Sequence, residues 1–558
     1  MKRKFKTVTI SLAIIFLSGI FIQASDEYFE ISKNLDIFAS LYREINTNYV
    51  DETKPGKLMK VGIDAMLKSL DPYTNYIPEA RIEDYRFMTT GQYGGIGALI
   101  QKRDEYIVIS ETYDGFPAQK AGMLIGDKIV EVDGQDIRGK TSSEISKFLK
   151  GQPESLVKIK IERGVQDDIE VIIKEIQRAE IVILNVPYYA EIEDGIGYIK
   201  LNGFTHTASS EFSKAFKELK EEKEIKSLIV DLRGNGGGLL RESVNIVNFF
   251  VNRGTEIVKT KGKLKEWDKT YKALNSPMDV DIPVIVLVNE NSASASEIVA
   301  GSLQDLDRAV IIGQETFGKG LVQQTVDLSY NSKLKVTVAK YYTPSGRCIQ
   351  RLNYSDRSKD GKAHEVPDSL IKEFKSLNYG RPLFDGKGIK PDIEIEDELL
   401  SNISIGLLRE LYIFDYATKF RLENESINNP EEYVMPEETI NAFKLFFENE
   451  EFEYSTPAEN LLEELKLSTE EENNYESIEQ EYNQLTQKLL EVKNNDFEKY
   501  KEEIQELLSA EIVLRYFNQK GELIYSIKND SYITRAIEVL NDKSQYDGIL
   551  SGSLKSTE

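Results

Sequence analysis

The sequence predicts a multidomain α/β protein: an amino-terminal helical module, a β-rich domain inserted before an α/β core, and a carboxy-terminal helical extension. Three observations predict it. Apolar residues recur at steps of three and four near both ends of the chain, short strands broken by glycine follow residue 91, and continuous apolar runs alternate with helical stretches between residues 180 and 400. The 558 residues are enough for about three or four domains.

Charge and composition exclude several classes of function. The net charge is −24, of which −19 belongs to residues 401–558, so a nucleic-acid binder is excluded because it needs a basic surface. The single cysteine, Cys348, excludes an intramolecular disulfide and a thiolate metal cluster. His206 and His364 are the only histidines, which disfavours a metal site and an imidazole base.

The first residues read as an export signal. Four cations within Met1–Lys6 precede an apolar run from Val8 to Ile22, and Ala24 offers a cleavage site, so residues 1–24 are expected to form a signal peptide. The protein is then exported, to a periplasm or cell envelope. An uncleaved signal would instead anchor the chain to the membrane.

Residues 27–90 are expected to form the helical module. The stripe of an amphipathic helix is followed by a second stripe, from Leu58 to Leu70, and Pro72 stops the helix. The first stripe comprises Ile31, Leu35, Phe38, Tyr42, Ile45 and Tyr49.

Residues 91–178 show short strands separated by glycine, with a helix at about 142–150 and a strand at 157–162. A Pro-Ala-x-x-Ala-Gly segment from Pro117 and a Gly-Asp-x-Ile-x-x-Val-Asp-Gly segment from Gly126 make this stretch resemble a PDZ domain. Such a domain adds a peptide as a strand to its edge and cups the terminal carboxylate with backbone N–H groups. Gly95, Ile96 and Gly97 are the expected cup; alternatively, these glycines only permit a bulge.

Residues 179–400 alternate strands and helices, as an α/β core does, and functional residues in such cores gather where strands end. Three strand ends are notable: a glycine loop over 231–239, a serine-rich turn over 289–298, and residues 309–324. Each of the first two segments also has a purely structural explanation. A tight turn between strand and helix is enough to explain the glycines, and Ser294 with Glu297 matches a capping box at the start of a helix.

The third strand end resembles a phosphate-binding loop only superficially. Gly313, Gly318 and Lys319 match that motif, but Gly320 stands where Ser or Thr should hold Mg²⁺, and a strand rather than a helix follows. We therefore reject nucleotide binding. A lysine in a dry pocket can instead act as a base, because desolvation disfavours the ammonium form, and serine needs such a base.

Four motifs then make the chain similar to the carboxy-terminal processing peptidases, from about Leu35 to Asp392. They are Asn291–Ile298, Thr316–Gln323, Tyr341–Arg347 and Gly388–Asp392. The resemblance implies a ClpP/crotonase-like core, a Ser/Lys dyad and an embedded PDZ domain. It also implies that no metal or organic cofactor is needed.

The resemblance assigns roles by position. Ser294 is the implied nucleophile, Lys319 the base, and Gln323 the residue that orients the lysine amine. The backbone N–H groups of Ala295 and Gly236 are the implied oxyanion hole. The implied function is a serine endopeptidase of the envelope that binds carboxy-terminal segments of exported proteins and forms an acyl-enzyme. The expected partners are peptides with accessible carboxy-termini and further copies of the chain, as a homodimer or higher homo-oligomer.

A non-catalytic PDZ adaptor that retains the peptidase scaffold is the alternative function. The presence of the serine, the lysine and the glutamine together argues against it.

Residues 401–558 are expected to form an acidic, mainly helical extension. A heptad-like seam steps from Tyr475 to Val492, and Glu522–Tyr525 reads as a short β-like stretch. The extension is expected to pack on the core or to mediate assembly. The alternative prediction is that it forms a surface on which an adaptor protein docks.

Overall fold

The computed structural model describes residues 28–165, 168–396, 399–449 and 452–554, so the expected signal peptide lies outside the described residues. The chain divides into two compact units. One comprises the chain up to Ile77 with Thr325–Val336, and the other comprises Pro78–Gln324 with the residues from Thr337 onward. Within the described residues, no helix is both long and apolar enough to cross a membrane.

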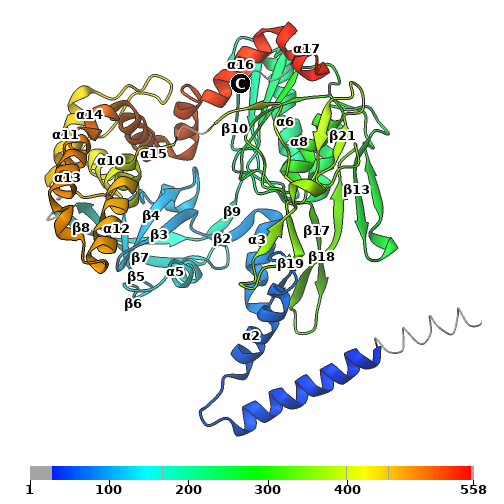
Figure 1. Ribbon diagram of the computed structural model, residues 1–558, viewed down its shortest axis with the longest axis horizontal. Helices are drawn as coiled ribbons and strands as arrows, with labels where there is room; N and C mark the ends of the chain where they lie inside the picture. Colours follow the sequence, from blue (N-terminus) through cyan, green and yellow to red (C-terminus); the bar gives the residue numbers. More distant parts are fainter. Residues whose placement is uncertain (1–27, 166–167, 397–398, 450–451, 555–558) are drawn as a thin grey trace, which may run out of the picture. The chain divides into compact units, whose positions relative to one another are not determined.

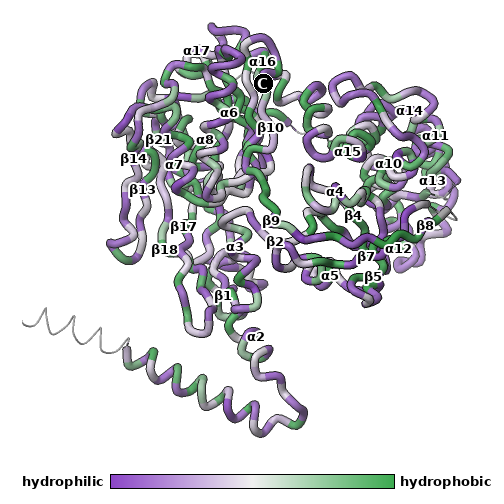
Figure 2. The backbone as a smooth tube through the Cα atoms, turned by 180° about the vertical axis from the view of Figure 1, so that it is seen from behind, coloured by the Kyte–Doolittle hydropathy of each residue, from purple (hydrophilic) through white to green (hydrophobic). Residues whose placement is uncertain are grey.

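The first unit contains the predicted amino-terminal helices. A helix over residues 28–48 precedes α2 (Pro55–Lys68), and β1 (Asn75–Ile77) pairs antiparallel with the first residues of β18 (Lys333–Tyr342). The first helix alternates hydrophobic and hydrophilic positions along its length (Figure 2). Its predicted apolar stripe is largely exposed: Leu35 is 63% exposed and Phe38 is 44% exposed.

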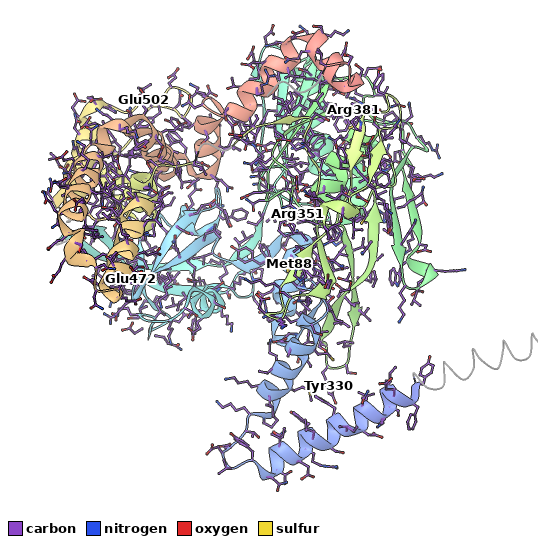
Figure 3. The ribbon with its side chains drawn as sticks, in the orientation of Figure 1. Met88, Tyr330, Arg351, Arg381, Glu472 and Glu502 are labelled. Atoms are coloured by element: carbon purple, nitrogen blue, oxygen red, sulfur yellow. The ribbon has the colours of Figure 1, made fainter. Side chains whose placement is uncertain are left out.

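The tip of the β17–β18 hairpin belongs to the same unit. Tyr330 lies in this tip with 93% of its surface exposed (Figure 3), after the end of β17 (Leu321–Asp327). The first residues of β17, up to Gln324, and the residues of β18 from Thr337 onward belong to the other unit.

The β-rich domain has a sheet in the order β3-β4-β5-β7-β8, with β6 paired to β5. Its core is formed by isoleucines and valines that alternate along the strands, and α5 begins with a capping box from Thr141. The elements of this sheet and its helices are β3 (Ala98–Arg103), β4 (Tyr106–Thr112), α4 (Pro117–Lys120), β5 (Lys128–Val132), β6 (Gln135–Asp136), α5 (Ser142–Leu149), β7 (Leu156–Val165) and β8 (Asp168–Gln177). Before it in the chain come η1 (Glu79–Arg81), α3 (Ile82–Thr90) and β2 (Gln92–Gly95), and β2 pairs with β9 (Ala179–Val182) in a separate two-stranded sheet.

The α/β core contains a six-stranded sheet in the order β10-β11-β12-β15-β16-β23, parallel from β11 to β23. Its central strands are buried runs of β-branched and aliphatic residues, as predicted. Helices α6 and α8 lie beside the strands (Figure 1). The elements of this sheet and its helices are β10 (Tyr188–Glu193), β11 (Ile196–Lys200), α6 (Ala208–Glu222), β12 (Ser227–Asp231), α7 (Leu240–Asn248), β15 (Val284–Val288), α8 (Ala295–Asp305), β16 (Val310–Gly313) and β23 (Ile393–Glu394).

Smaller elements surround this sheet. Strand β13 pairs antiparallel with β14 and with the last residues of β18. Strand β19 pairs with β20, and β21 pairs with β22. The bounds of these smaller elements are β13 (Glu256–Gly262), η2 (Lys265–Trp267), β14 (Lys269–Lys272), β19 (Leu352–Arg357), β20 (Ala363–Glu365), η3 (Asp368–Leu370), β21 (Glu373–Lys375) and β22 (Pro382–Phe384).

The carboxy-terminal extension is helical, as predicted, but has two separate packing roles. Helices α9, α10, α11, α14 and α15 share their own aromatic core, whereas α16 and α17 cover one face of the six-stranded sheet. The helices are α9 (Asn402–Arg409), α10 (Tyr412–Glu423), α11 (Glu437–Asn449), α12 (Pro457–Glu471), η4 (Tyr475–Ser477), α13 (Glu479–Lys493), α14 (Asp496–Lys499), α15 (Lys501–Ile527), α16 (Ser531–Asn541) and α17 (Lys543–Ser551).

One local prediction in the extension is wrong, and another is confirmed only in part. Glu522–Tyr525 belongs to α15, where Tyr525 packs against Tyr433 of the aromatic core, so tertiary packing overrides the β-like composition. The predicted heptad seam does lie on a helix from Tyr482 to Val492, but α13 starts only at Glu479, after Tyr475. Leu485, in the middle of the seam, is 50% exposed.

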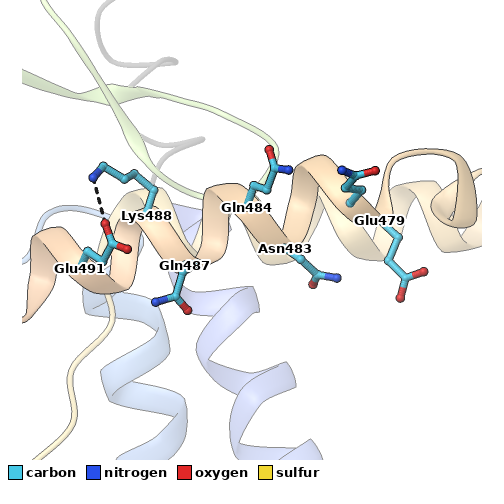
Figure 4. A pocket seen from close by; sticks show the side chains of 7 residues that line it. Glu479, Asn483, Gln484, Gln487, Lys488 and Glu491 are labelled. Carbon is cyan, nitrogen blue, oxygen red and sulfur yellow. Dashed lines mark hydrogen bonds and ion pairs between the residues drawn. The ribbon is translucent and has the colours of Figure 1, made fainter.

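The outer surface of α13 is polar. A shallow hollow of about 620 Å³ is lined there by amide and charged side chains, and Lys488 pairs with Glu491 (Figure 4). Among the described residues, no serine, threonine or cysteine lines this hollow, so it holds no hydroxyl or thiol nucleophile.

Candidate active site

The three predicted strand ends meet at one edge of the six-stranded sheet. Strands β12, β15 and β16 are neighbours and parallel, so their carboxyl ends lie side by side. The loops that follow carry the glycine loop, the serine-rich turn and the lysine segment. Such an edge is where open α/β sheets place their functional residues.

Ser294 ends the turn between β15 and α8. Its φ is 56° and its ψ is −108°, a region that residues other than glycine rarely occupy. Such a conformation costs of order 1–3 kcal/mol and persists only where surrounding contacts fix it. Ser294 is half-buried, and the next residue, Ala295, is buried at the first position of α8.

The glycine loop packs directly against this turn. Gly237 has a φ of 96°, and a Cβ on it would lie 2.6 Å from the carbonyl oxygen of Ala293 and 2.9 Å from the nitrogen of Ala295. Only glycine fits at this position, because any side chain would push the loop away from the serine turn.

Two serines beside Ser294 join the turn to the loop. The Ser292 hydroxyl donates to the carbonyl of Leu232 at 2.9 Å. The Ser296 hydroxyl (2.8 Å) and the Ala293 N–H (3.0 Å) both donate to the carbonyl of Asn235. These two serines therefore hold the backbone, and their hydroxyls are already engaged.

Two backbone N–H groups, one after Ser294 and one in the glycine loop, remain available. Within the described part of the chain, the N–H groups of Ala295 and Gly236 donate to no other protein group. The N–H of Gly237, by contrast, donates to Oδ1 of Asn235 at 2.9 Å. Unengaged backbone donors can stabilise negative charge on an oxygen, and that of Ala295 also lies at the start of α8.

Glu297 joins the serine turn to the lysine segment. Its side chain is fully buried, and its Oε1 accepts from the Thr316 hydroxyl (2.6 Å) and the Gly318 N–H (2.8 Å). Its Oε2 accepts from the N–H groups of Ser294 (2.7 Å) and Lys319 (2.9 Å). Burial raises the pKa of Glu297, and the four donors oppose that rise. One carboxylate oxygen therefore brings the backbones of Ser294 and Lys319 together.

The lysine segment is also fixed from its other side. The Arg351 N–H donates to the Gly318 carbonyl (2.9 Å), and Oε1 of Gln350 accepts from the Gly320 N–H (2.8 Å); Figure 3 labels Arg351. A Cβ on Gly318, whose φ is 85°, would lie 2.6 Å from the Cβ of Arg351. Lys319 is half-buried between these two fixed glycines.

Gln323 lies on β17, four residues after Lys319. Its Nε2 donates to the Thr337 hydroxyl of β18 at 3.3 Å, and its side chain is half-buried. This bond fixes the amide with its nitrogen toward Thr337. The opposite end of the amide is a carbonyl oxygen, which is the kind of acceptor that an amine needs.

The predicted carboxylate cup lies between β2 and β3. Gly95 pairs with Ala179 of β9, Ile96 is buried, and Gly97 has a φ of 76°. A Cβ on Gly97 would lie 2.5 Å from the Cβ of Phe116, so only glycine fits. Within the described residues, the N–H groups of Ile96 and Gly97 donate to no protein acceptor.

Strand β3 offers an open edge beside this cup. It pairs only with β4 among the described strands and ends the order of its sheet, and α5 packs beside it. Leu99 on this strand is 44% exposed. An edge of this kind can accept a peptide as an additional strand.

The sequence missed the wider role of Glu297. The spacing from Ser294 predicts only a helix cap, and the structure adds Thr316, Gly318 and Lys319 as donors. The only signal was an acid at the third helical position after a serine, which is common at helix starts.

Comparison with known proteins identifies the class. The model of "Peptidase family S41" matches residues 195–354, that of "PDZ domain" matches residues 108–163, and that of "Probable PDZ-protease, C-terminal helical domain" matches residues 403–540. The chain is thus a serine peptidase that carries a PDZ domain and a helical carboxy-terminal domain.

Individual relatives identify the family more closely. A carboxy-terminal-processing protease of Bartonella bacilliformis is 36% identical over 355 residues, covering 61% of this chain and 80% of the relative. A probable CtpA-like serine protease of Staphylococcus aureus is 34% identical over 400 residues, covering 70% of this chain and 74% of the relative. The chain therefore belongs to the carboxy-terminal processing peptidases.

Among solved structures, the photosystem II D1 C-terminal processing protease is similar. It is 28% identical, with a TM-score of 0.35, over 65% of this chain and 93% of that protein.

Proposed function

We propose that this serine peptidase cleaves peptide bonds with a dyad of Ser294 and Lys319. The observation that carries the proposal is the shared carboxylate oxygen of Glu297, which accepts from the backbone N–H groups of both residues. Proton transfer needs the serine hydroxyl and the lysine amine within hydrogen-bond reach, and joining the two backbones to one oxygen lets the side chains approach each other.

The reaction would proceed by acyl transfer. Neutral Lys319 accepts the hydroxyl proton of Ser294 as the serine oxygen attacks the peptide carbonyl carbon. The N–H groups of Ala295 and Gly236 stabilise the negative oxygen of the tetrahedral intermediate. The lysine ammonium then protonates the leaving amine, and water hydrolyses the ester with Lys319 again acting as the base.

The environment of Lys319 must keep its amine neutral. Exclusion of water by the substrate disfavours the ammonium form, and the carbonyl oxygen of Gln323 can orient the amine as a hydrogen-bond acceptor. The fixed amide of Gln323 and the half-buried position of Lys319 support this role.

The PDZ domain would select the substrate. The available N–H groups of Ile96 and Gly97 and the open edge of β3 suit a peptide with a free carboxy-terminus. The expected substrates are therefore exported proteins with accessible carboxy-terminal segments, and the expected location is the cell envelope, on the evidence of residues 1–24. The exposed apolar stripe of the helix over 28–48 supports a homodimer.

Digestion of a denatured exported protein tests the proposed dyad. Wild type should cleave it, and Ser294→Ala and Lys319→Ala should lose the activity while remaining folded. Lys390→Ala is the matched control, because that lysine is exposed and pairs only with Glu394 among its described neighbours. Equal digestion by wild type and the two dyad variants would overturn the proposal.

A further inference from the structure

The glycine loop of the active site begins at Arg233, two residues after β12 ends. Its Nε and Nη2 donate to the Asp231 carboxylate at 3.1 and 2.8 Å, and its backbone N–H donates to the same carboxylate at 2.9 Å. Lys200 Nζ donates to the Arg233 carbonyl at 2.9 Å. Both the side chain and the backbone of Arg233 are therefore held.

A second carboxylate reaches Arg233 from the carboxy-terminal extension. Asp530, 297 residues later in the chain, accepts from Nη1 at 3.0 Å through Oδ1, and its Oδ2 lies 2.8 Å from Nη2. The guanidinium carbon also lies 4.8 Å from the centre of the Tyr532 ring. The arginine is thus enclosed by an acid of the core and by an acid and an aromatic ring of the extension.

Asp530 is itself held rigidly. It is the N-cap of α16, and its Oδ1 accepts from the N–H groups of Tyr532 (2.9 Å) and Ile533 (3.1 Å). Both of these residues are buried against the six-stranded sheet, together with Ala536 and Val539. The carboxylate therefore has a fixed position relative to the sheet that carries the active site.

The position of Arg233 affects the residues that follow it. The Gly234 N–H donates to Oδ1 of Asn289 at 2.9 Å, and Gly237 packs against the Ser294 turn. Gly236 lies between these two contacts. An oxyanion donor is effective only within a few tenths of an ångström of its best position, so a small shift at the start of the loop weakens it.

We propose that Asp530 is a positioning residue for the peptidase reaction: through Arg233 it fixes the loop that carries the Gly236 N–H. This inference rests on the proposed function of that loop as part of the oxyanion hole. It gives the last two helices of the extension a role in catalysis besides covering the sheet. Without the Asp530 carboxylate, the guanidinium of Arg233 keeps its hydrogen bonds to Asp231 and its contact with Tyr532 but loses one of its two acids, and the loop gains freedom.

The variant Asp530→Asn tests this proposal. Asparagine caps a helix as well as aspartate does, so α16 should stay intact while the negative charge beside Arg233 disappears. We expect kcat for a peptide substrate to fall about 10-fold, as expected for a misplaced oxyanion donor, with KM within about twofold of wild type. A role in folding alone would change the melting temperature without changing kcat at low temperature.

The matched control is Asp542→Asn, which makes the same change at the N-cap of α17. Asp542 accepts from the N–H groups of Ser544 and Gln545, and no described cation pairs with it. Its kcat should equal that of wild type. Asp530→Glu, which restores the charge, should recover part of the lost kcat.

Hydrogen exchange tests the positioning without relying on catalysis. The amides of Gly234, Asn235 and Gly237 all have acceptors in wild type, so Asp530→Asn should speed their exchange and Asp542→Asn should not. Unchanged exchange and unchanged kcat in Asp530→Asn would overturn the inference. If Ser294→Ala were as active as wild type, the proposed function would fail, and exchange would still decide whether Asp530 holds the loop.

Discussion

Replacing Glu297 by glutamine tests how the two halves of the proposed dyad are held together. The carboxylate accepts four hydrogen bonds, two on each oxygen. A glutamine offers one acceptor oxygen and one NH2 group, so it cannot accept from all four donors. The least costly orientation turns the NH2 toward Thr316, whose hydroxyl can rotate to accept, and leaves the Gly318 N–H unpaired.

The expected size of the effect follows from that count. One buried donor without a partner costs about 1–3 kcal/mol. If the cost is felt as displacement of the lysine segment during the reaction, kcat/KM falls by about 5- to 150-fold, at about 1.4 kcal/mol for each factor of ten. Glu297→Ala removes the acceptor for all four donors and should reduce kcat/KM further.

The assay is kcat/KM on a peptide substrate at a temperature well below unfolding, together with a thermal melt. Glu290→Gln is the control, because Glu290 is exposed in the same turn as Ser294 and should have no effect. A Glu297→Gln enzyme with lowered stability but unchanged kcat/KM would refute the reasoning. It would mean that the four bonds support the fold without setting the geometry of the dyad.

Two further predictions concern the PDZ domain. Burial, then the charges of Glu522 and Asp114, raise the pKa of Glu111 from 4.5 to about 7. The folded state therefore favours the protonated Glu111 side chain. The stability that this preference contributes is fully present below pH 4.5 and is lost as the pH rises through about 7. In urea titrations Glu111→Gln should therefore be more stable than wild type by about 1–2 kcal/mol at pH 8 and equal at pH 4; equal stability at both would contradict this. Gly97→Ala should place a methyl group against Phe116 and so distort the proposed cup. We expect this variant to bind a labelled peptide with a free carboxy-terminus at least about 10-fold more weakly, as measured by fluorescence anisotropy. Unchanged affinity would contradict the proposed cup.

Much of the fold could be predicted because its signals are local. Strands β12 and β15 contain runs of aliphatic residues, many of them β-branched, and such runs occur where both faces of a sheet are covered. The residues after Lys319 were expected to form a strand, and β17 starts at Leu321. These elements depend on neighbours along the chain rather than on distant contacts.

Other features depend on contacts that composition does not reveal. Glu522–Tyr525 has a β-like composition, yet it is helical because Tyr525 joins an aromatic core made from distant residues. The split of the extension into a separate helical domain and a pair of helices on the sheet has no local signal either. Apolar positions such as Ile533 could have faced any surface.

The candidate site divides in the same way. Motif order was sufficient to suggest Ser294 and Lys319, and the structure places both at one sheet edge. The contact of Arg233 with Asp530 joins residues nearly 300 positions apart, for which no spacing rule exists. The four donors on Glu297 likewise come from two segments that meet only in the folded chain.

The central claim is that an uncharged Lys319 amine activates the Ser294 hydroxyl. The most direct measurement is the rate at which a fluorophosphonate labels the enzyme across the pH range, with the labelled residue identified by mass spectrometry. We expect the label on Ser294, a rate that rises with a midpoint well below the ordinary lysine pKa of about 10.4, and a rate at least about 100-fold lower in Lys319→Ala. Labelling of a different serine, or an unchanged rate in Lys319→Ala, would contradict the account.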